Sequence, residues 1–474
     1  MLFNRVPVSK SPAAQTRDAA SVPADTRKPA PHRRVFSRVL SSLGIASFAY
    51  LLGAAVMFFE LPSSGFLTNA FVGARAWNER REFSSGAATQ RSSPVLTRQA
   101  DKPARTFDGF TLYTASTAQA PKAQAYLVDM TGQQVHQWAM PFSKVWPNPP
   151  HIHGRIDDFF VTFFATHLYA NGDLLVVYHG LDALATGYGL IKLDKDSNVL
   201  WKYPALVHHD VDVGEDGSIY AIQQEVLDEA PHGLELIPTP CVVDYLVMLS
   251  PEGKLLRKPV GILEAFRDSA YAPLLSLLEK PTEQTGTRGL AAARFSEAVR
   301  RLDALHTNFV HVLTRQLAPS FPQFKTGQVL LSIRNLDTLA VLDIDRKAVV
   351  WAAQGPWQHQ HDAQFLGNGH LLVFDNRGSP ESSRVLEYDP QTLAFPWSYS
   401  GENRGGFRST ERGMNQRLAN GNTLVVNSCG GELLEVTADK EVVWSFAING
   451  YIATARRYAP QELHFLKGET LARP

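Results

Sequence analysis

Alternation of apolar and polar positions runs through most of the chain beyond residue 107 and predicts short β-strands. One recurring phrase joins an apolar strand, a turn rich in Asp, Gly, Lys and Asn, and a second strand that commonly ends at a tryptophan. Alternation on both sides of such a turn is typical of a β-hairpin. The phrase occurs six times, at residues 125–138, 189–203, 245–259, 339–353, 384–399 and 433–446.

A second phrase, in which a Gly-containing turn leads into an apolar strand, precedes these hairpins. It stands at residues 168–179, 213–223, 325–335, 366–376 and 418–428, and residues 109–114 could begin a further, degenerate copy. Two hairpins in series make a four-stranded antiparallel unit, and radial repetition around a channel fits six such units. We therefore predict an all-β fold, a six-bladed β-propeller over residues 107–474.

Two segments break the repeat. Residues 263–280 and 288–306 have apolar positions at helical spacing and a helix-forming composition. They predict a helical insertion at about 262–305, between the third and fourth hairpins. Long insertions usually decorate one face of a scaffold, so this one either covers the channel mouth or docks a partner.

The N-terminal part predicts a membrane anchor. Residues 1–38 carry eight lysines and arginines against two aspartates and are expected to be a disordered cytoplasmic tail. Residues 39–59 are 21 residues without a charge, enough to span a ~30 Å hydrocarbon core as one transmembrane helix. A cleaved signal peptide is the alternative. The basic tail places the N-terminus in the cytoplasm and, in a bacterium, the propeller in the periplasm at the inner membrane. Residues 60–106 are expected to be a tether.

Composition excludes some classes of protein. The 46 basic and 46 acidic side chains balance, which argues against a nucleic-acid-binding protein. Two cysteines, Cys241 and Cys429, are too few for a disulfide framework. They either pair in an oxidising compartment or remain free thiols.

Three histidines share one position in the predicted repeat. Aligned on the turn, His209, His306 and His361 each stand where a blade's innermost strand starts. The following strand ends in polar residues, which are His179, Gln224, Arg334, Asn376 and Ser428, with Arg377 one position further. These two sets are expected to meet at one mouth of the channel, which is a default location for a site.

Several chemistries suit such a cluster. Histidines beside a turn are often only structural hydrogen-bonding groups. Three of them could instead bind zinc, but no carboxylate is placed to help, and we expect no metal. Arginines favour an oxyanion, and imidazoles can transfer protons or act as nucleophiles. Asp210 and Asp362 face the other side of their strands and are expected to tie blades together. The hairpin tryptophans are expected to be packing residues.

Several motifs resemble those of the bacterial arylsulfotransferase family. They are HHD (208–210), HTN (306–308), SIRN (332–335), GPWQHQHDAQFLGNG (355–369), FDN (374–376), SRVLEYDP (383–390) and QRLANGNTLVV (416–426). The resemblance implies a six-bladed propeller outside the cytoplasm. It also implies transfer of a sulfuryl group from a phenolic sulfate ester to another phenol, through a transiently sulfated histidine and without a nucleotide sulfate donor or other cofactor.

The resemblance also implies site residues. His361, His306, His209 and Arg377 match the family's catalytic positions, with Arg384 or Arg334 as the alternative arginine. The sulfated histidine of the family belongs in the last blade, near NSCGG (427–431), where this chain has no histidine. The residues expected to bind substrate are Arg334, Asn376, His179 and His208.

Two functions therefore remain open from the sequence. The first is a membrane-anchored sulfuryl transferase that takes an aryl sulfate and a phenolic small molecule. The second is a propeller without enzymatic activity that serves as a binding or scaffold subunit for membrane-protein partners.

Overall fold

The computed structural model describes Ser47 and residues 105–116, 123–152, 156–180, 186–235, 237, 239–279, 303–402 and 404–468. The chain divides into one unit of residues 1–80 and another of residues 81–474, and every strand belongs to the second. The tail, nearly all of the predicted anchor and tether, and residues 280–302 of the predicted insertion lie outside the described residues. Among the residues that are described, no helix has the length and apolar character needed to cross a membrane.

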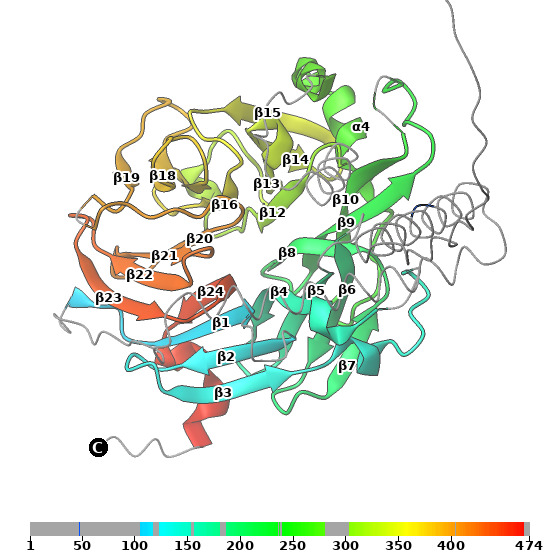
Figure 1. Cartoon of the computed structure of the whole chain (residues 1–474). Helices are drawn as coiled ribbons and strands as arrows, with labels where there is room; N and C mark the ends of the chain where they lie inside the picture. The colour runs from blue at the N-terminus through cyan, green and yellow to red at the C-terminus, as the bar shows by residue number, and fades with distance from the viewer. Residues whose placement is uncertain are drawn as a thin grey trace, which may run out of the picture. The chain divides into compact units, whose positions relative to one another are not determined.

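The described residues form six four-stranded antiparallel sheets, which confirms the predicted six-bladed propeller. Figure 1 shows the sheets around a common axis, with β4, β8, β12, β16, β20 and β24 nearest to it. The first two blades are β24 (Tyr451–Tyr458), β1 (Phe110–Ser116), β2 (Gln124–Val128) and β3 (Gln134–Ala139), then β4 (Val161–Leu168), β5 (Leu174–Gly180), β6 (Gly187–Leu193) and β7 (Val199–Tyr203). The next two are β8 (Val207–Val213), β9 (Ile219–Leu227), β10 (Cys241–Leu249) and β11 (Val260–Gly261), then β12 (Thr307–Val312), β13 (Val329–Ile333), β14 (Thr338–Asp343) and β15 (Ala348–Gln354).

The fifth and sixth blades complete the ring. They are β16 (His361–Phe365), β17 (Leu371–Asp375), β18 (Arg384–Tyr388) and β19 (Trp397–Tyr399), then β20 (Met414–Arg417), β21 (Thr423–Asn427), β22 (Glu432–Val436) and β23 (Val442–Ala447). The helices are short: α3 (Phe142–Val145), η2 (Asp158–Phe160), α4 (Ile262–Arg267), η3 (Ala272–Glu279), η4 (Ala318–Ser320), η5 (Arg334–Leu336), η6 (Pro460–Glu462) and η7 (His464–Gly468). Of the predicted helical insertion, only α4 and η3 fall within the described residues.

The first blade closes the ring with a strand from the other end of the chain. Its innermost strand, β24, pairs with β1 from Phe110 opposite Tyr458 to Ser116 opposite Tyr451. The sequence pattern predicts only that residues 109–114 begin a degenerate hairpin. The repeat pattern does not predict β24 as the partner of β1, because no turn and second strand follow β24.

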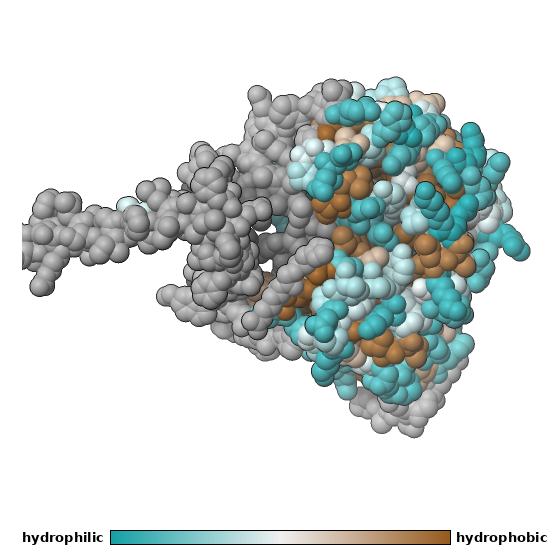
Figure 2. Space-filling model, turned by 90° about the vertical axis from the view of Figure 1, so that its right-hand side faces the viewer, coloured by the Kyte–Doolittle hydropathy of each residue, from teal (hydrophilic) through white to brown (hydrophobic). Residues whose placement is uncertain are grey.

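Apolar cores lie between neighbouring blades. Successive strand residues face opposite sides of a sheet, so each blade contributes to two cores. In β13, for example, Leu330 packs in the core shared with the fifth blade, and Leu331 in the core shared with the third. At the outside, Figure 2 shows hydrophilic residues interspersed with separate apolar patches. The blades are therefore held together face to face by burial of apolar side chains.

The hairpin tryptophans also connect blades. The indole N–H of Trp138 donates to Gly172 O at 3.1 Å, and that of Trp201 donates to Pro251 O at 3.0 Å, in each case in the following blade. Trp397 and Trp444 repeat this contact with Ala438 and Met130. Trp138 and Trp444 are buried, which agrees with their predicted packing role.

Side chains cap the free edges of the innermost strands. An edge strand presents unpaired backbone N–H groups, and here the preceding blade supplies acceptors. The Asp210 carboxylate accepts from Val310 N at 3.2 Å, and the Asp362 carboxylate accepts from Asn415 N. The prediction that these two aspartates tie blades together is confirmed.

Other side chains cap backbone N–H groups of the following blade in the same way. Asp212 accepts from Val312 N at 2.8 Å, His311 accepts from Phe365 N at 3.0 Å, and Gln416 accepts from Arg457 N at 2.7 Å. A buried donor without an acceptor is costly. These contacts therefore stabilise the ring at its narrowest part.

Asp362→Ala should lower the free energy of unfolding by about 1–3 kcal/mol, because the buried Asn415 N–H loses its acceptor. Asp362→Asn should cost less, since an amide oxygen can still accept this hydrogen bond. Urea unfolding followed by tryptophan fluorescence measures both. Equal losses in the two variants would contradict the capping role.

Candidate active site

The propeller brings the aligned histidines together. His209 is the third residue of β8, His306 directly precedes β12, and His361 begins β16. The ring centroids of His209 and His306 are 4.7 Å apart, and those of His179 and His209 are 5.9 Å apart. Burial and the charges of Arg334 and Arg412 lower the pKa of His361, and Arg412 also donates to the His209 carbonyl, so His361 belongs to the same cluster.

The backbone is irregular where these residues stand. Strand pairing shifts between His208 and Val211, between Thr307 and Phe309, and between His361 and Gln364. His209 and His306 have left-handed φ angles of 57° and 50°, which are uncommon for residues other than glycine. Bulges re-aim side chains and are frequent beside active sites. The same distortion in successive blades turns the histidines toward one another.

Hydrogen bonds fix the tautomer of His361. Its Nδ1 lies 2.7 Å from Asn376 Oδ1 and 3.0 Å from the His359 carbonyl. The Asn376 amide nitrogen donates to Ser409 O at 2.6 Å, so the amide oxygen faces the imidazole. Both partners of Nδ1 are acceptors, and Nδ1 therefore carries the proton. The lone pair of His361 is on Nε2.

A carboxylate determines the tautomer of His306. His306 Nδ1 donates to Asp303 Oδ2 at 2.6 Å, so the lone pair of His306, like that of His361, is on Nε2. His209 Nδ1 lies 2.5 Å from His208 Nδ1, and one of these two nitrogens donates to the other. Asp244 Oδ1 lies 3.2 Å from His208 Nε2, without a hydrogen bond between them.

Burial keeps three histidines of the cluster neutral. It lowers the pKa of His179 to about 3 and holds the pKa of His209 and His361 well below the ordinary value. The positive charge of Arg412 adds to the effect on all three. Neutral imidazoles with a free Nε2 are potential nucleophiles and bases at pH 7.

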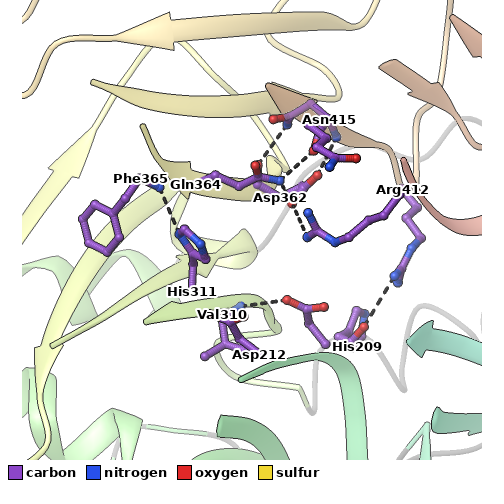
Figure 3. Close-up of polar contacts among 12 residues, drawn as sticks. His209, Asp212, Val310, His311, Asp362, Gln364, Phe365, Arg412 and Asn415 are labelled. Carbon is purple, nitrogen blue, oxygen red and sulfur yellow. Dashed lines mark hydrogen bonds and ion pairs between the residues drawn. The ribbon is translucent and has the colours of Figure 1, made fainter. Parts of the chain in front are cut away.

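Arg412 and Phe164 join the cluster without having been predicted. The Arg412 guanidinium donates from Nε to Ala453 O and from Nη2 to Phe164 O and His209 O, at 3.2 and 3.4 Å. Figure 3 shows Arg412 reaching toward His209. The guanidinium carbon lies 3.7 Å from the centroid of the Phe164 ring, and the His179 ring stacks on Phe164 at 4.0 Å. Two groups so close to one ring centre must occupy its opposite faces.

The other predicted residues surround this cluster in different ways. Arg334 donates to Asn335 Oδ1 at 3.0 Å. Arg377 donates its Nε–H to Thr410 O at 3.0 Å. His208 is fully buried behind His209 and supports it rather than facing a ligand. In the last blade, Cys429 is exposed, and both it and Cys241 are free thiols.

Metal binding has no arrangement of side chains to support it within the described part of the chain. No group of three or more His, Cys, Asp or Glu residues there is placed to hold a metal ion.

Comparison with known proteins agrees with this picture. The family described as Arylsulfotransferase (ASST) matches residues 166–450. No curated protein matches the chain. Among solved structures, a protein of unknown function from Bacteroides caccae is 12% identical, covers 74% of this chain and 99% of its own, and has a TM-score of 0.45. A virginiamycin B lyase from Staphylococcus aureus is 8% identical, covers 60% and 69%, and has a TM-score of 0.32. Similarities this low do not bear on function.

The carboxyl group next to His209 should make stability depend on pH. Burial raises the pKa of Asp210 to about 8, above its unfolded value of about 4. At a pH between the unfolded and the folded pKa, Asp210 is protonated in the folded state and ionised in the unfolded state. Its contribution to the free energy of unfolding therefore falls as pH rises, by at most about 1.4 kcal/mol per pH unit. Asp210→Asn should remove this contribution, so the variant gains stability relative to wild type from pH 5 to pH 8. If urea unfolding showed the stabilities of wild type and Asp210→Asn changing in parallel from pH 5 to pH 8, this contribution of Asp210 would be contradicted.

Proposed function

The chain belongs to the arylsulfotransferase (ASST) family, and we propose that it transfers a sulfuryl group from a phenolic sulfate ester to a second phenol at the histidine cluster. The observation that supports this most is the gathering of imidazoles in which Nδ1 of His306 and of His361 is committed to a hydrogen bond, so that Nε2 carries the lone pair. An imidazole nitrogen with a lone pair can act as the nucleophile of a group transfer.

His306 is the best-placed nucleophile. About a quarter of its side chain is exposed (23%), whereas His209 and His361 are buried. Its Nδ1–H is held by the Asp303 carboxylate at 2.6 Å. A carboxylate in this position orients an imidazole and stabilises the positive charge that develops when Nε2 forms a bond. The His306–Asp303 pair would take the place of the last-blade histidine implied by the family.

The reaction would have two balanced steps. In the first, His306 Nε2 attacks the sulfur of the donor ester and an N–S bond forms. The bond between the sulfur and the phenolic oxygen breaks, which releases a phenolate. In the second, the oxygen of the acceptor phenol attacks the same sulfur and the N–S bond breaks. The acceptor loses its proton as it attacks, and His361 Nε2 is free to receive it.

His306→Ala should reduce kcat/KM for transfer from 4-nitrophenyl sulfate to a phenol by about 10²–10⁴-fold, because the nucleophile is lost. Asp303→Asn should reduce it less, since the imidazole remains without its orienting carboxylate. Release of 4-nitrophenol measures the rate.

His232→Ala is the matched control, because the His232 side chain is fully exposed (101%), and it should keep wild-type activity. Full activity in His306→Ala would exclude this residue as the nucleophile. Loss of activity in His361→Ala alone would transfer that role to His361.

The same proposal includes a location. We propose that residues 39–59 anchor the chain in the inner membrane with the propeller in the periplasm, on the strength of the uncharged run and the basic residues before it. The full-length chain should then remain in membranes after an alkaline carbonate wash and should be digested by protease in spheroplasts. A soluble mature chain that begins after residue 59 would identify a cleaved signal peptide instead.

A further inference from the structure

Arg412 is a buried cation that the described residues do not neutralise. The residue is 4% exposed, and its hydrogen bonds go to the backbone carbonyls of Ala453, Phe164 and His209. Within the described part of the chain, no carboxylate lies within ion-pair distance of its guanidinium. A buried charge without a counter-charge costs several kcal/mol, so this arrangement calls for an anion.

The nearest acidic groups do not serve as counter-charges. Burial raises the pKa of the Tyr451 phenol, which is neutral at pH 7. Asp362 lies 3.7 Å from Arg456 and accepts from Asn415 N. Asp210 accepts from Val310 N, and burial raises its pKa to about 8. Both carboxyl groups are therefore occupied at the junctions between blades.

Arg457 shows how this chain otherwise treats a buried arginine. It is 2% exposed, donates to Glu435 Oε2 at 2.9 Å, and lies over the Trp444 ring at 4.2 Å. Arg412 has the equivalent aromatic contact with Phe164 but lacks the equivalent carboxylate. The difference singles out Arg412 as a position where the counter-charge comes from a ligand.

Arg412 Nη1 and His179 Nδ1 are buried nitrogens without a hydrogen-bond partner, and they belong to the groups on the two faces of the Phe164 ring. His208 Nε2, behind His209, is another such nitrogen. Nη1 carries two N–H groups, and Nε and Nη2 are already committed to carbonyls. The unused edge of the guanidinium can therefore donate to oxygens of one ligand.

We propose that Arg412 Nη1 is the anion-binding group of this site and holds the sulfuryl oxygens of a sulfate monoester. This inference rests on the proposed function for the identity of the ligand. It replaces the arginine implied by family resemblance, Arg377, whose Nε–H is bound to Thr410 O. Guanidinium N–H groups match sulfuryl oxygens in charge and geometry. The bound sulfur would lie among the imidazoles, and the structural ties of Arg412 would keep the donor group in place.

Binding of an anion here should raise the pKa of the histidines around it. Burial, together with the charge of Arg412, keeps the pKa of His179, His209 and His361 low. An anion at Nη1 would offset the charge of Arg412, while the burial of the imidazoles would be unchanged.

The direct test is calorimetric titration of the wild-type protein with inorganic sulfate and with phenyl sulfate, at fixed ionic strength set with chloride. Both ligands should bind. Inorganic phosphate should bind in the same way, whereas added chloride should not compete. Absence of binding, or equal competition by chloride, would overturn the proposal.

Three variants locate the site. Arg412→Gln should weaken sulfate binding by about 10–100-fold, the loss expected for one charge-assisted contact. Arg377→Gln and the control Arg417→Gln, whose arginine pairs with Glu387, should bind within about threefold of wild type. Loss of binding in Arg377→Gln with retention in Arg412→Gln would overturn the assignment.

Arg412 also ties strands together, so a variant that unfolds needs a second measurement. Arg412→Lys keeps the charge but cannot reach three carbonyls and a ligand together, and it should bind sulfate more weakly than wild type while remaining folded by far-UV circular dichroism. Sulfate binding that is lost in Arg412→Gln, in a protein that never turns over aryl sulfates, would support this site and reject the enzymatic proposal. Turnover with an unchanged KM in folded Arg412→Lys would support the enzymatic proposal and reject Arg412 as the anion-binding group.

Discussion

The pairing of β24 with β1 is the constraint on which the rest of the molecule depends. These strands come from opposite ends of the described propeller, and their pairing closes the ring. His179, His209, His306 and His361 lie in consecutive blades and meet through the packing of neighbouring blades. Closure of the ring adds Arg412 from the last blade, which donates to the carbonyl of His209 although the two residues are 203 positions apart.

Closing the ring creates a second problem, because each innermost strand is an edge with free N–H groups. The chain solves it with buried side-chain acceptors, among them Asp210 and Asp362. Figure 3 shows Asp362 in contact with Asn415 and Gln364. This solution has an electrostatic consequence at the site. The carboxyl groups committed to the junctions are buried and favour protonation, so they leave the positive charge of Arg412 without a partner.

The sequence predicts the parts of this architecture that repeat. Strand alternation and turns locate the hairpins. A fixed distance from the turn places His209 and His361 at strand starts, and His306 begins the same strand in a longer copy of the repeat. The same alternation predicts the inter-blade role of Asp210 and Asp362. Residues outside the repeat could not be found this way. Arg412 stands in the irregular segment before β20, Phe164 looks like an ordinary core residue of β4, and Asp303 falls inside a predicted helical segment. Their roles depend on contacts between blades, which no local pattern encodes.

The central claim is that one sulfuryl group can contact a histidine nucleophile and a buried arginine at the same time. A crystal structure of the propeller with a non-transferable aryl sulfonate tests this most directly. The account predicts sulfonate oxygens within hydrogen-bond distance of Arg412 Nη1, the sulfur facing His306 Nε2, and the aromatic ring directed away from both. A sulfonate bound at Arg377, or on a surface remote from these histidines, would contradict it.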